Sequence, residues 1–266
     1  MKMFENIPKE LTNVVVTGKS GAGKQPRIDV LVSEFQLEQL STGNIFRTYL
    51  GKFNEFGYDD DLGIFWDEEE DSFVSDDEIS KILETTDPDI ILGMKAKYFV
   101  DRGLFVPDYI TNELFKGFFS QRNFRGQVLD GYPRTLSQAK FLLELLEENK
   151  SDIDFILWVE NEDNMIIERT INRRICPECG KVYHLIYAPP NDGKCKVCDT
   201  EVIQRSDDTE EKIRSRLKEF SEKVIPAMEF MEEQGVSIAK VPGHLEEFTP
   251  ENVRKSVLGA INEIYK

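Results

Sequence analysis

Short apolar runs alternate with longer amphipathic stretches along most of the chain. Strand-like runs occupy residues 13–18, 127–130, 154–160 and 236–241, and a weaker one covers residues 36–42. Between them, apolar positions recur with helical spacing over residues 27–34, 137–148, 164–174 and 208–234. This alternation predicts an α/β fold in which a mostly parallel sheet carries helices on both faces.

The carboxyl ends of such strands are where ligands bind. The first run is followed by Gly18–Lys24, and the 127–130 run ends at Asp130, which is followed by Gly131-Tyr132-Pro133-Arg134. We therefore expect these two segments to lie side by side at one edge of the sheet and to form the binding site.

The segment Gly18–Lys24, GKSGAGK, fits most of the Walker pattern G-x-x-x-x-G-K-[ST]. Glycines let backbone N–H groups converge on phosphate oxygens, the following helix adds its positive end, and lysine adds a point charge. The hydroxyl residue is missing, because Gln25 and Pro26 follow the lysine. The pattern predicts a phosphate site, with a ligand-free glycine turn as the alternative.

An acidic stretch interrupts the α/β rhythm. Between Glu55 and Asp89 there are 15 acidic residues and one lysine, so this stretch carries −14 of the chain's net charge of −17. It also holds aromatic residues, and Ser75-x-x-Glu78 is a capping-box pattern that predicts a short helix to about Glu84. We expect a solvated, partly folded elaboration, with partner binding as the second interpretation. Removing residues 56–86 should then leave a folded chain.

A cysteine segment is the second interruption. Cys176, Cys179, Cys195 and Cys198 follow the pattern C-x2-C-x15-C-x2-C, with Gly180 after the first pair. Two such turns present four thiolates tetrahedrally and predict a closed structural zinc site. Disulfides or free thiols are the alternative, and spacing alone also allows iron.

Charge and composition narrow the class of protein. A net charge of −17 argues against a nucleic-acid or anionic-membrane surface, and no apolar run is long enough to span a bilayer. The polar start, broken by Pro8, is unlike a signal peptide. With cysteines spaced for metal, we expect a cytoplasmic location.

Arginines gather on both sides of the cysteine segment. Guanidinium groups bind phosphate bidentately, so these arginines favour a phosphate-containing ligand.

Four ordered blocks resemble the adenylate kinase family in its long form with a metal-bearing lid. They are GKSGAGK (18–24), LSTGNIFR (40–47), VLDGYPRTLSQA (128–139) and a cysteine-containing block (173–217). The resemblance covers nearly the whole chain except the acidic insert. It implies a P-loop kinase core from residues 1–41, 107–172 and 207–266, an AMP-binding lobe from 42–106 with the insert at about 55–89, and a zinc-stapled lid from 173–206.

The resemblance also implies site residues. ATP would be bound by Gly21, Ala22, Gly23, Lys24, Gln25, Arg169, Arg173, Val182, Tyr183 and Leu245. AMP would be bound by Thr42, Arg47, Leu104, Val106, Gly131, Arg134, Gln138, Arg205 and Arg216. The catalytic set would be Lys24, Asp130, Arg134, Arg173, Arg205 and Arg216.

The implied reaction is reversible, Mg²⁺-dependent phosphoryl transfer from ATP to AMP, which gives two ADP, in a monomer that also holds structural Zn²⁺. The family usually has Gly-Thr where Gln25-Pro26 stands, and aspartate where Asn44 stands. We expect the loop to bind ATP and the enzyme to turn over more weakly than with Gly-Thr. The alternatives are a kinase for another nucleoside monophosphate, and a weak nucleotide-binding scaffold whose acidic insert binds a protein partner.

Overall fold

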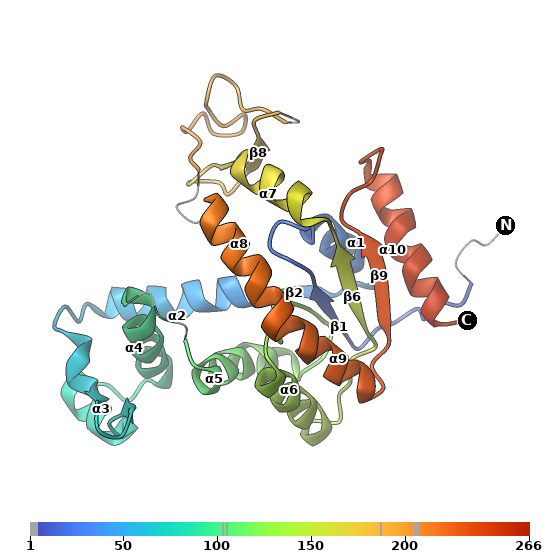
Figure 1. The fold of residues 1–266 in the computed structure, drawn as a ribbon. Helices are drawn as coiled ribbons and strands as arrows, with labels where there is room; N and C mark the ends of the chain where they lie inside the picture. The colour runs from blue at the N-terminus through green and yellow to red at the C-terminus, as the bar shows by residue number, and fades with distance from the viewer. Residues whose placement is uncertain (1–4, 103, 105, 187, 205–207) are drawn as a thin grey trace.

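The computed structural model describes residues 5–102, 104, 106–186, 188–204 and 208–266. Five strands of these residues form one parallel sheet in the order β2-β5-β1-β6-β9 (Figure 1). Their bounds are β1 Asn13–Thr17, β2 Glu38–Ser41, β5 Gln127–Asp130, β6 Phe155–Glu160 and β9 Ile238–Pro242. The predicted parallel sheet is confirmed, including its weakest strand.

Helices cover both faces of this sheet, as the pattern predicts. Val14 and Val16 pack in one cluster with side chains of α1 Gln25–Phe35 and α10 Pro250–Ile264. Val15 points to the opposite face and packs with side chains of α6 Leu136–Glu148 and α9 Ile225–Glu233. Because successive residues of a strand point to opposite faces, the three consecutive valines of β1 supply both clusters.

Strand register sets the position of the site. In the sheet, Asp130 at the end of β5 lies beside Val16 of β1 on one side and beside Ser41 of β2 on the other. The glycine loop leaves β1 one residue later, and Thr42 follows β2 directly. Three segments distant in the sequence therefore meet at one edge of the sheet.

The segment predicted as the lobe, residues 42–106, contains two packed helices, α2 Thr42–Phe56 and α4 Pro88–Asp101. Gly93 permits their close approach, since a Cβ there would lie 2.5 Å from the carbonyl oxygen of Tyr49. Between these helices come a short 3-10 turn, a small hairpin and another helix, namely Leu62–Phe65, β3 Trp66–Asp67, β4 Ser72–Phe73 and α3 Asp76–Leu83. Helix α5, Asp108–Phe119, returns the chain to the sheet.

The acidic insert is a packed part of the lobe, and our expectation of a solvated, partly folded elaboration is wrong. Phe65 and Ile79 are fully buried and belong to the same apolar cluster as residues of α2 and α4. The Trp66 ring stacks on Tyr98 of α4 with centroids 5.1 Å apart. The acidic side chains lie outside this cluster, because the hairpin and α3 are amphipathic. The capping box is confirmed: the Ser75 side chain accepts a hydrogen bond from the Glu78 N–H at the start of α3.

Two predicted helices differ from the structure. Helix α7, Asp163–Ile171, ends before Arg173, which begins β7, Arg173–Ile175, paired with β8, Val182–His184. The predicted helix over residues 208–234 is divided into α8, Glu210–Glu219, a π-helical turn over residues 220–224, and α9. Pro226 in the first turn of α9 has no N–H to donate to the preceding turn, which accounts for the irregular hydrogen bonding there.

The described residues of the predicted lid, 173–186 and 188–204, project from the core beside α7 and α8, well apart from α3 and α4 (Figure 1). Among the described residues, no helix has both the length and the apolar character needed to cross a membrane.

Candidate active site

The glycine loop connects β1 to α1. Gly21 and Gly23 have φ values of +88° and +96°, which side chains rarely adopt. A Cβ at Gly21 would also lie 2.6 Å from the Thr170 hydroxyl oxygen. Pro26 lies in the first turn of α1, where its missing N–H breaks no helical hydrogen bond. The two unusual residues after Lys24 are therefore compatible with the loop-to-helix junction.

Lys24 lies at the centre of the charged groups. Its Nζ donates to the Gly18 carbonyl oxygen at 3.0 Å, which folds the side chain over the loop. Burial lowers the pKa of Lys24; Asp130 opposes this shift, while the charges of Arg134 and Arg173 add to it. An anion bound here would relieve the surplus of positive charge, so the site is electrostatically suited to phosphate.

Arg134 and Thr42 converge on the turn after β5. The Arg134 Nε donates to the Gly131 carbonyl oxygen at 2.8 Å, and the Thr42 hydroxyl donates to the same oxygen at 3.2 Å. Arg134 is exposed at its surface, but desolvation of its guanidinium by the surrounding protein lowers its pKa, with the carboxylates of Asp130 and Glu219 opposing the shift. Arg216, on α8, also acts on Arg134 electrostatically. The predicted catalytic residues Lys24, Asp130, Arg134, Arg173 and Arg216 are therefore electrostatic neighbours.

Gln138 is buried near this turn, and its amide orientation is fixed at both ends. Its Nε2 donates to Asp108 Oδ1 at 2.7 Å, and its Oε1 accepts from the Arg134 backbone N–H at 2.8 Å. Asp108, which the sequence analysis did not single out, also accepts from the Thr135 hydroxyl at 2.6 Å. Its place at the start of α5, directly after Pro107, is the sequence signal that marks it as a helix-start residue.

The other residues predicted at the AMP site are spread along the lobe. Arg47 is exposed on α2, where its guanidinium donates to the Asn44 side chain. Leu104 is exposed, whereas Val106 packs against the main apolar cluster. Arg205 lies outside the described residues.

Arg173 has a partner that sequence reasoning missed. Its guanidinium donates to both carboxylate oxygens of Asp208, at 2.9 and 2.6 Å, and Asp208 is fully buried. Such bidentate pairs fix orientation as well as charge. The acidic pair at the end of the RSDD motif was the available signal. The ion pair joins the first strand of the lid to the segment that leads into α8.

Arg169 contacts the segment that leads to Leu245, which is distant in the chain. Arg169 Nη1, on α7, donates to the Gly243 carbonyl oxygen at 3.3 Å, and Leu245 follows two residues later. In the lid, Val182 is exposed. Tyr183 is buried and its hydroxyl lies 3.2 Å from Cys195 Sγ, so its side chain faces the cysteines.

Arg27 is another charged residue that the sequence pattern did not mark. It is fully buried beneath the glycine loop, and its guanidinium donates to the carbonyl oxygens of Gly23 at 3.2 Å and Pro242 at 2.6 Å. Burial, followed by the charge of Arg169, lowers the pKa of Arg27 to about 10. These bonds tie the loop to the end of β9.

The four cysteines form a single cluster. Their sulfurs all lie within 4.8 Å of one another, with Cys176 3.4 Å from Cys198 and Cys179 3.5 Å from Cys195. None of the four is in a disulfide, and a tetrahedral zinc with bonds of about 2.3 Å would place its sulfurs about 3.8 Å apart. The geometry fits a four-thiolate metal site better than disulfides.

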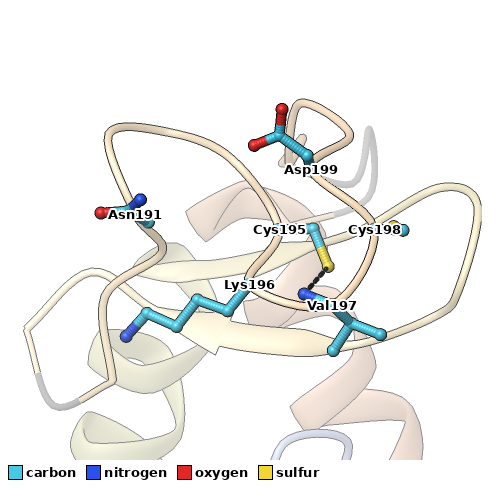
Figure 2. Close-up of a pocket in the computed structure, with 6 residues that line it drawn as sticks. All are labelled: Asn191, Cys195, Lys196, Val197, Cys198 and Asp199. Carbon is cyan, nitrogen blue, oxygen red and sulfur yellow. Dashed lines mark hydrogen bonds between the residues drawn. The ribbon is translucent and has the colours of Figure 1, made fainter.

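Hydrogen bonds around the second cysteine pair, Cys195 and Cys198, favour the thiolate form of Cys195. The Val197 N–H donates to Cys195 Sγ at 3.4 Å, as Figure 2 shows for this turn of residues 195–199. Burial raises the pKa of Cys195, but hydrogen bonds from the Tyr183 hydroxyl, the backbone at Val197 and Cys198, and the Cys179 side chain together outweigh it and bring the pKa to about 6. A deprotonated sulfur is the form that ligates metal.

Comparison with known proteins agrees with this geometry. The family model for adenylate kinase matches residues 80–236. An adenylate kinase of Clostridium perfringens (strain SM101 / Type A) is 34% identical over 219 residues, which are 82% of this chain and 85% of that protein. An adenylate kinase of Thermosipho africanus is 32% identical over 251 residues, 94% of this chain and 99% of that one. This chain therefore belongs to the adenylate kinase family.

Proposed function

We propose that this protein is an adenylate kinase that transfers a phosphoryl group reversibly between ATP and AMP, with two ADP as the product. The observation that carries the proposal is the convergence of Lys24, Arg134, Arg173 and Asp130 at the carboxyl edge of the parallel sheet. The relatives bearing this name match most of the chain. Phosphoryl transfer depends mainly on positioning and on charge stabilisation, which this arrangement supplies.

In this proposal the ATP phosphates lie on the glycine loop, with contributions from Gly21, Ala22, Gly23 and Gln25. Lys24 would leave the Gly18 carbonyl and donate to the outer phosphates. Arg169 would lie along the adenine, near the backbone at Leu245, while Val182 and the backbone of Tyr183 would contact ATP from the lid. Burial of Tyr183 against the cysteines makes its backbone the available contact.

Mg²⁺ would accompany ATP beside Asp130. Its carboxylate is partly exposed and offers a hard oxygen ligand, and Mg²⁺ keeps several of its waters in such sites, so an all-protein cage is unnecessary. When bound, the metal would neutralise charge on the phosphates. Asp130 would hold and orient the waters of its shell by accepting hydrogen bonds from them.

AMP would lie in the lobe on the other side of Asp130. Arg47 and Arg134 would bind its phosphate, while Thr42, Gly131 and the segment containing Leu104 and Val106 would line the site. Gln138 would face the base. Its amide is held by Asp108 and the Arg134 backbone, which favours selection of an adenine edge over a pyrimidine.

During transfer, the arginines would follow the phosphoryl group between the two nucleotides. Arg173 and Arg216 lie close to the loop lysine or to Arg134, and Arg205 would join them as the lid closes. Exclusion of water by the closed lid would prevent ATP hydrolysis. The cysteine cluster would bind Zn²⁺, and the metal would keep this small lid folded. The enzyme would be cytoplasmic and monomeric.

The decisive test is to supply ADP with Mg²⁺ and measure formation of ATP and AMP. Arg134→Ala should lower turnover by about 10²-fold or more, because a charge-stabilising group is lost. Arg214→Ala is the matched control: this α8 arginine is exposed and paired with Glu210, and its loss should change turnover by less than about twofold. Acceptor comparison among AMP, CMP, UMP and GMP should favour AMP. Nucleotide binding without any turnover would replace the kinase by the scaffold alternative.

A further inference from the structure

Gln25, one of the two residues that depart from the family loop, takes part in a reciprocal amide pair. Its Nε2 donates to Gln39 Oε1 at 2.9 Å, and Gln39 Nε2 donates back to Gln25 Oε1 at 3.2 Å. Gln25 Nε2 also donates to Asp29 Oδ1, one turn further along α1, at 2.9 Å. The start of α1 is thereby connected to β2 through side chains.

The pair continues to the carboxylate at the end of β5. Gln39 Nε2 donates to Asp130 Oδ2 at 3.0 Å, and this contact is partly shielded from solvent. An amide has one donor end and one acceptor end. Because Gln25 occupies the acceptor end of Gln39, the donor end is held toward Asp130. Among the described residues, the hydrogen bond to the Asp130 carboxylate is to Oδ2, and Oδ1 accepts none.

The hydroxyl that a Walker loop supplies to Mg²⁺ is absent here, because Gln25 stands at its position in the Walker pattern and Pro26 stands where the family usually has threonine. The orientation of the metal's water shell must then come from other groups. A carboxylate that is held at one oxygen and open at the other is suited to accept hydrogen bonds from those waters. Because the Gln39 amide is neutral, its hydrogen bond leaves the negative charge of the carboxylate unchanged.

We propose that Gln25 and Gln39 are positioning residues that hold Asp130 for the water shell of nucleotide-bound Mg²⁺. The inference rests on the proposed function, since it assigns Mg²⁺-ATP to this site. Gln25 acts through Gln39, and Gln39 acts through Asp130. Gln25, which follows the loop lysine, therefore does more than replace the usual family residue: through Gln39 it helps to hold the carboxylate that orients the water shell of Mg²⁺.

The test separates metal affinity from turnover. Mg²⁺ is titrated calorimetrically into the protein saturated with a bisubstrate mimic of two linked adenosines. Gln39→Ala should raise the Mg²⁺ dissociation constant about tenfold, since one hydrogen bond to a charged group is lost. Gln25→Ala should raise it less, by about threefold, because Gln39 keeps its own bond to Asp130. In Gln39→Ala, affinity for the mimic without metal should stay within about twofold, because Gln39 is not assigned a nucleotide contact.

Two further variants trace the path. Asp29→Ala is the matched control, since it removes the other partner of Gln25 and should leave Mg²⁺ affinity within about twofold. In an Asp130→Asn background, Gln39→Ala should have no further effect on Mg²⁺ affinity. Gln39→Asn, which keeps an amide, should recover part of the loss if its shorter arm still reaches Asp130.

The outcomes distinguish this inference from the function beneath it. If the unmodified protein binds neither the mimic nor Mg²⁺, the kinase proposal fails and the pair has no role in it. If it binds both and converts ADP, but Gln39→Ala and Gln25→Ala leave Mg²⁺ affinity unchanged, the positioning pair is overturned and the kinase stands. In Gln39→Ala, a loss of mimic affinity equal to the loss of Mg²⁺ affinity would indicate a structural role only, and would also overturn it.

Discussion

The lobe and the lid are small appendages of one sheet, and they are held together in different ways. The insert of the lobe buries Phe65 and Ile79 completely and joins an apolar cluster that continues through α4 to the sheet. The lid has its own small cluster, made of Cys176, Tyr183 and Cys195 with Val202 against it. Several large apolar side chains of the lid remain exposed.

The difference follows from what each segment can pack against. The insert lies along α4, so its buried apolar side chains gain neighbours from a helix that is already part of the core. The lid projects away from the sheet, and a flap of this size cannot bury enough surface to order itself. Four thiolates within 4.8 Å of one another supply the missing constraint when a metal is bound.

The largest expected effect is the loss of the lid's structure when the metal is removed. Chelation, or Cys179→Ser, should abolish about one bound zinc per chain and let lid amides exchange freely, because metal binding and folding are coupled in small sites. Metal analysis and hydrogen exchange measure this. Lobe amides around α3 and α4 serve as the internal control and should keep their protection. A metal-free protein whose lid amides remain fully protected from exchange would contradict the claim that the metal, and not apolar packing, orders the lid.

Phe65→Ala should produce the next largest effect, on the lobe. Removing this fully buried ring should lower the free energy of unfolding by about 3–5 kcal/mol, from lost burial and the cavity left behind. Ile64→Ala is the matched control, because Ile64 is 55% exposed and its loss should cost less than about 0.5 kcal/mol. Urea unfolding with and without chelator gives both values.

Deleting residues 56–86 extends the same test. We now expect an unfolded lobe, contrary to the expectation from sequence, because Tyr98 and Phe99 of α4 would lose the rings that cover them. A folded truncation with the stability of the full chain would show that this packing contributes little.

The sequence was sufficient for the parallel sheet because apolar runs of strand length, bounded by glycines and polar turns, have few other interpretations. It was insufficient for the insert, since twelve acidic residues between positions 56 and 86 outweigh the apolar positions in any average. Burial is decided by the pattern of apolar and polar positions within α3 and the hairpin, and by how these elements pack on α4. That packing is a tertiary contact, which a local sequence pattern does not specify.

The candidate site divides in the same way. The glycine loop and cysteine spacing are local patterns, so sequence alone marks them. Asp208, Arg27 and Gln39 are recognisable only from their partners, which are distant in the chain or belong to another strand or helix. No local pattern distinguishes a buried arginine in α1 from a solvated one.

Arg47→Ala tests the functional side of the comparison, with AMP assigned to the lobe and ATP to the lid side. Losing a charge-assisted contact to the acceptor phosphate should cost about 2–3 kcal/mol in AMP use while ATP binding stays unchanged. Steady-state kinetics with each nucleotide varied in turn measures the two effects. Arg102→Ala is the control, because this lobe arginine lies over Tyr98 and pairs with Asp61. An equal loss for both nucleotides would mean that the acceptor site is misplaced.

The smallest expected effect on the free energy of unfolding concerns the charges of the insert. It tests whether apolar packing alone is sufficient to join α3 to α4. Lys95 of α4 reaches Asp76 of α3 at 2.5 Å, with side chains 12% and 65% exposed. The pair is open to solvent on the acidic side, so Coulomb attraction is weakened by water and salt. Lys95→Met keeps the apolar stem and should lower the free energy of unfolding by only about 0.2–1 kcal/mol. Lys97→Met is the control, since its partner Asp101 lies on the same helix. Unfolding measured from low to high salt completes the test: a cost above about 2 kcal/mol that disappears in salt would show that ion pairs join α3 to α4 and would overturn packing as the explanation.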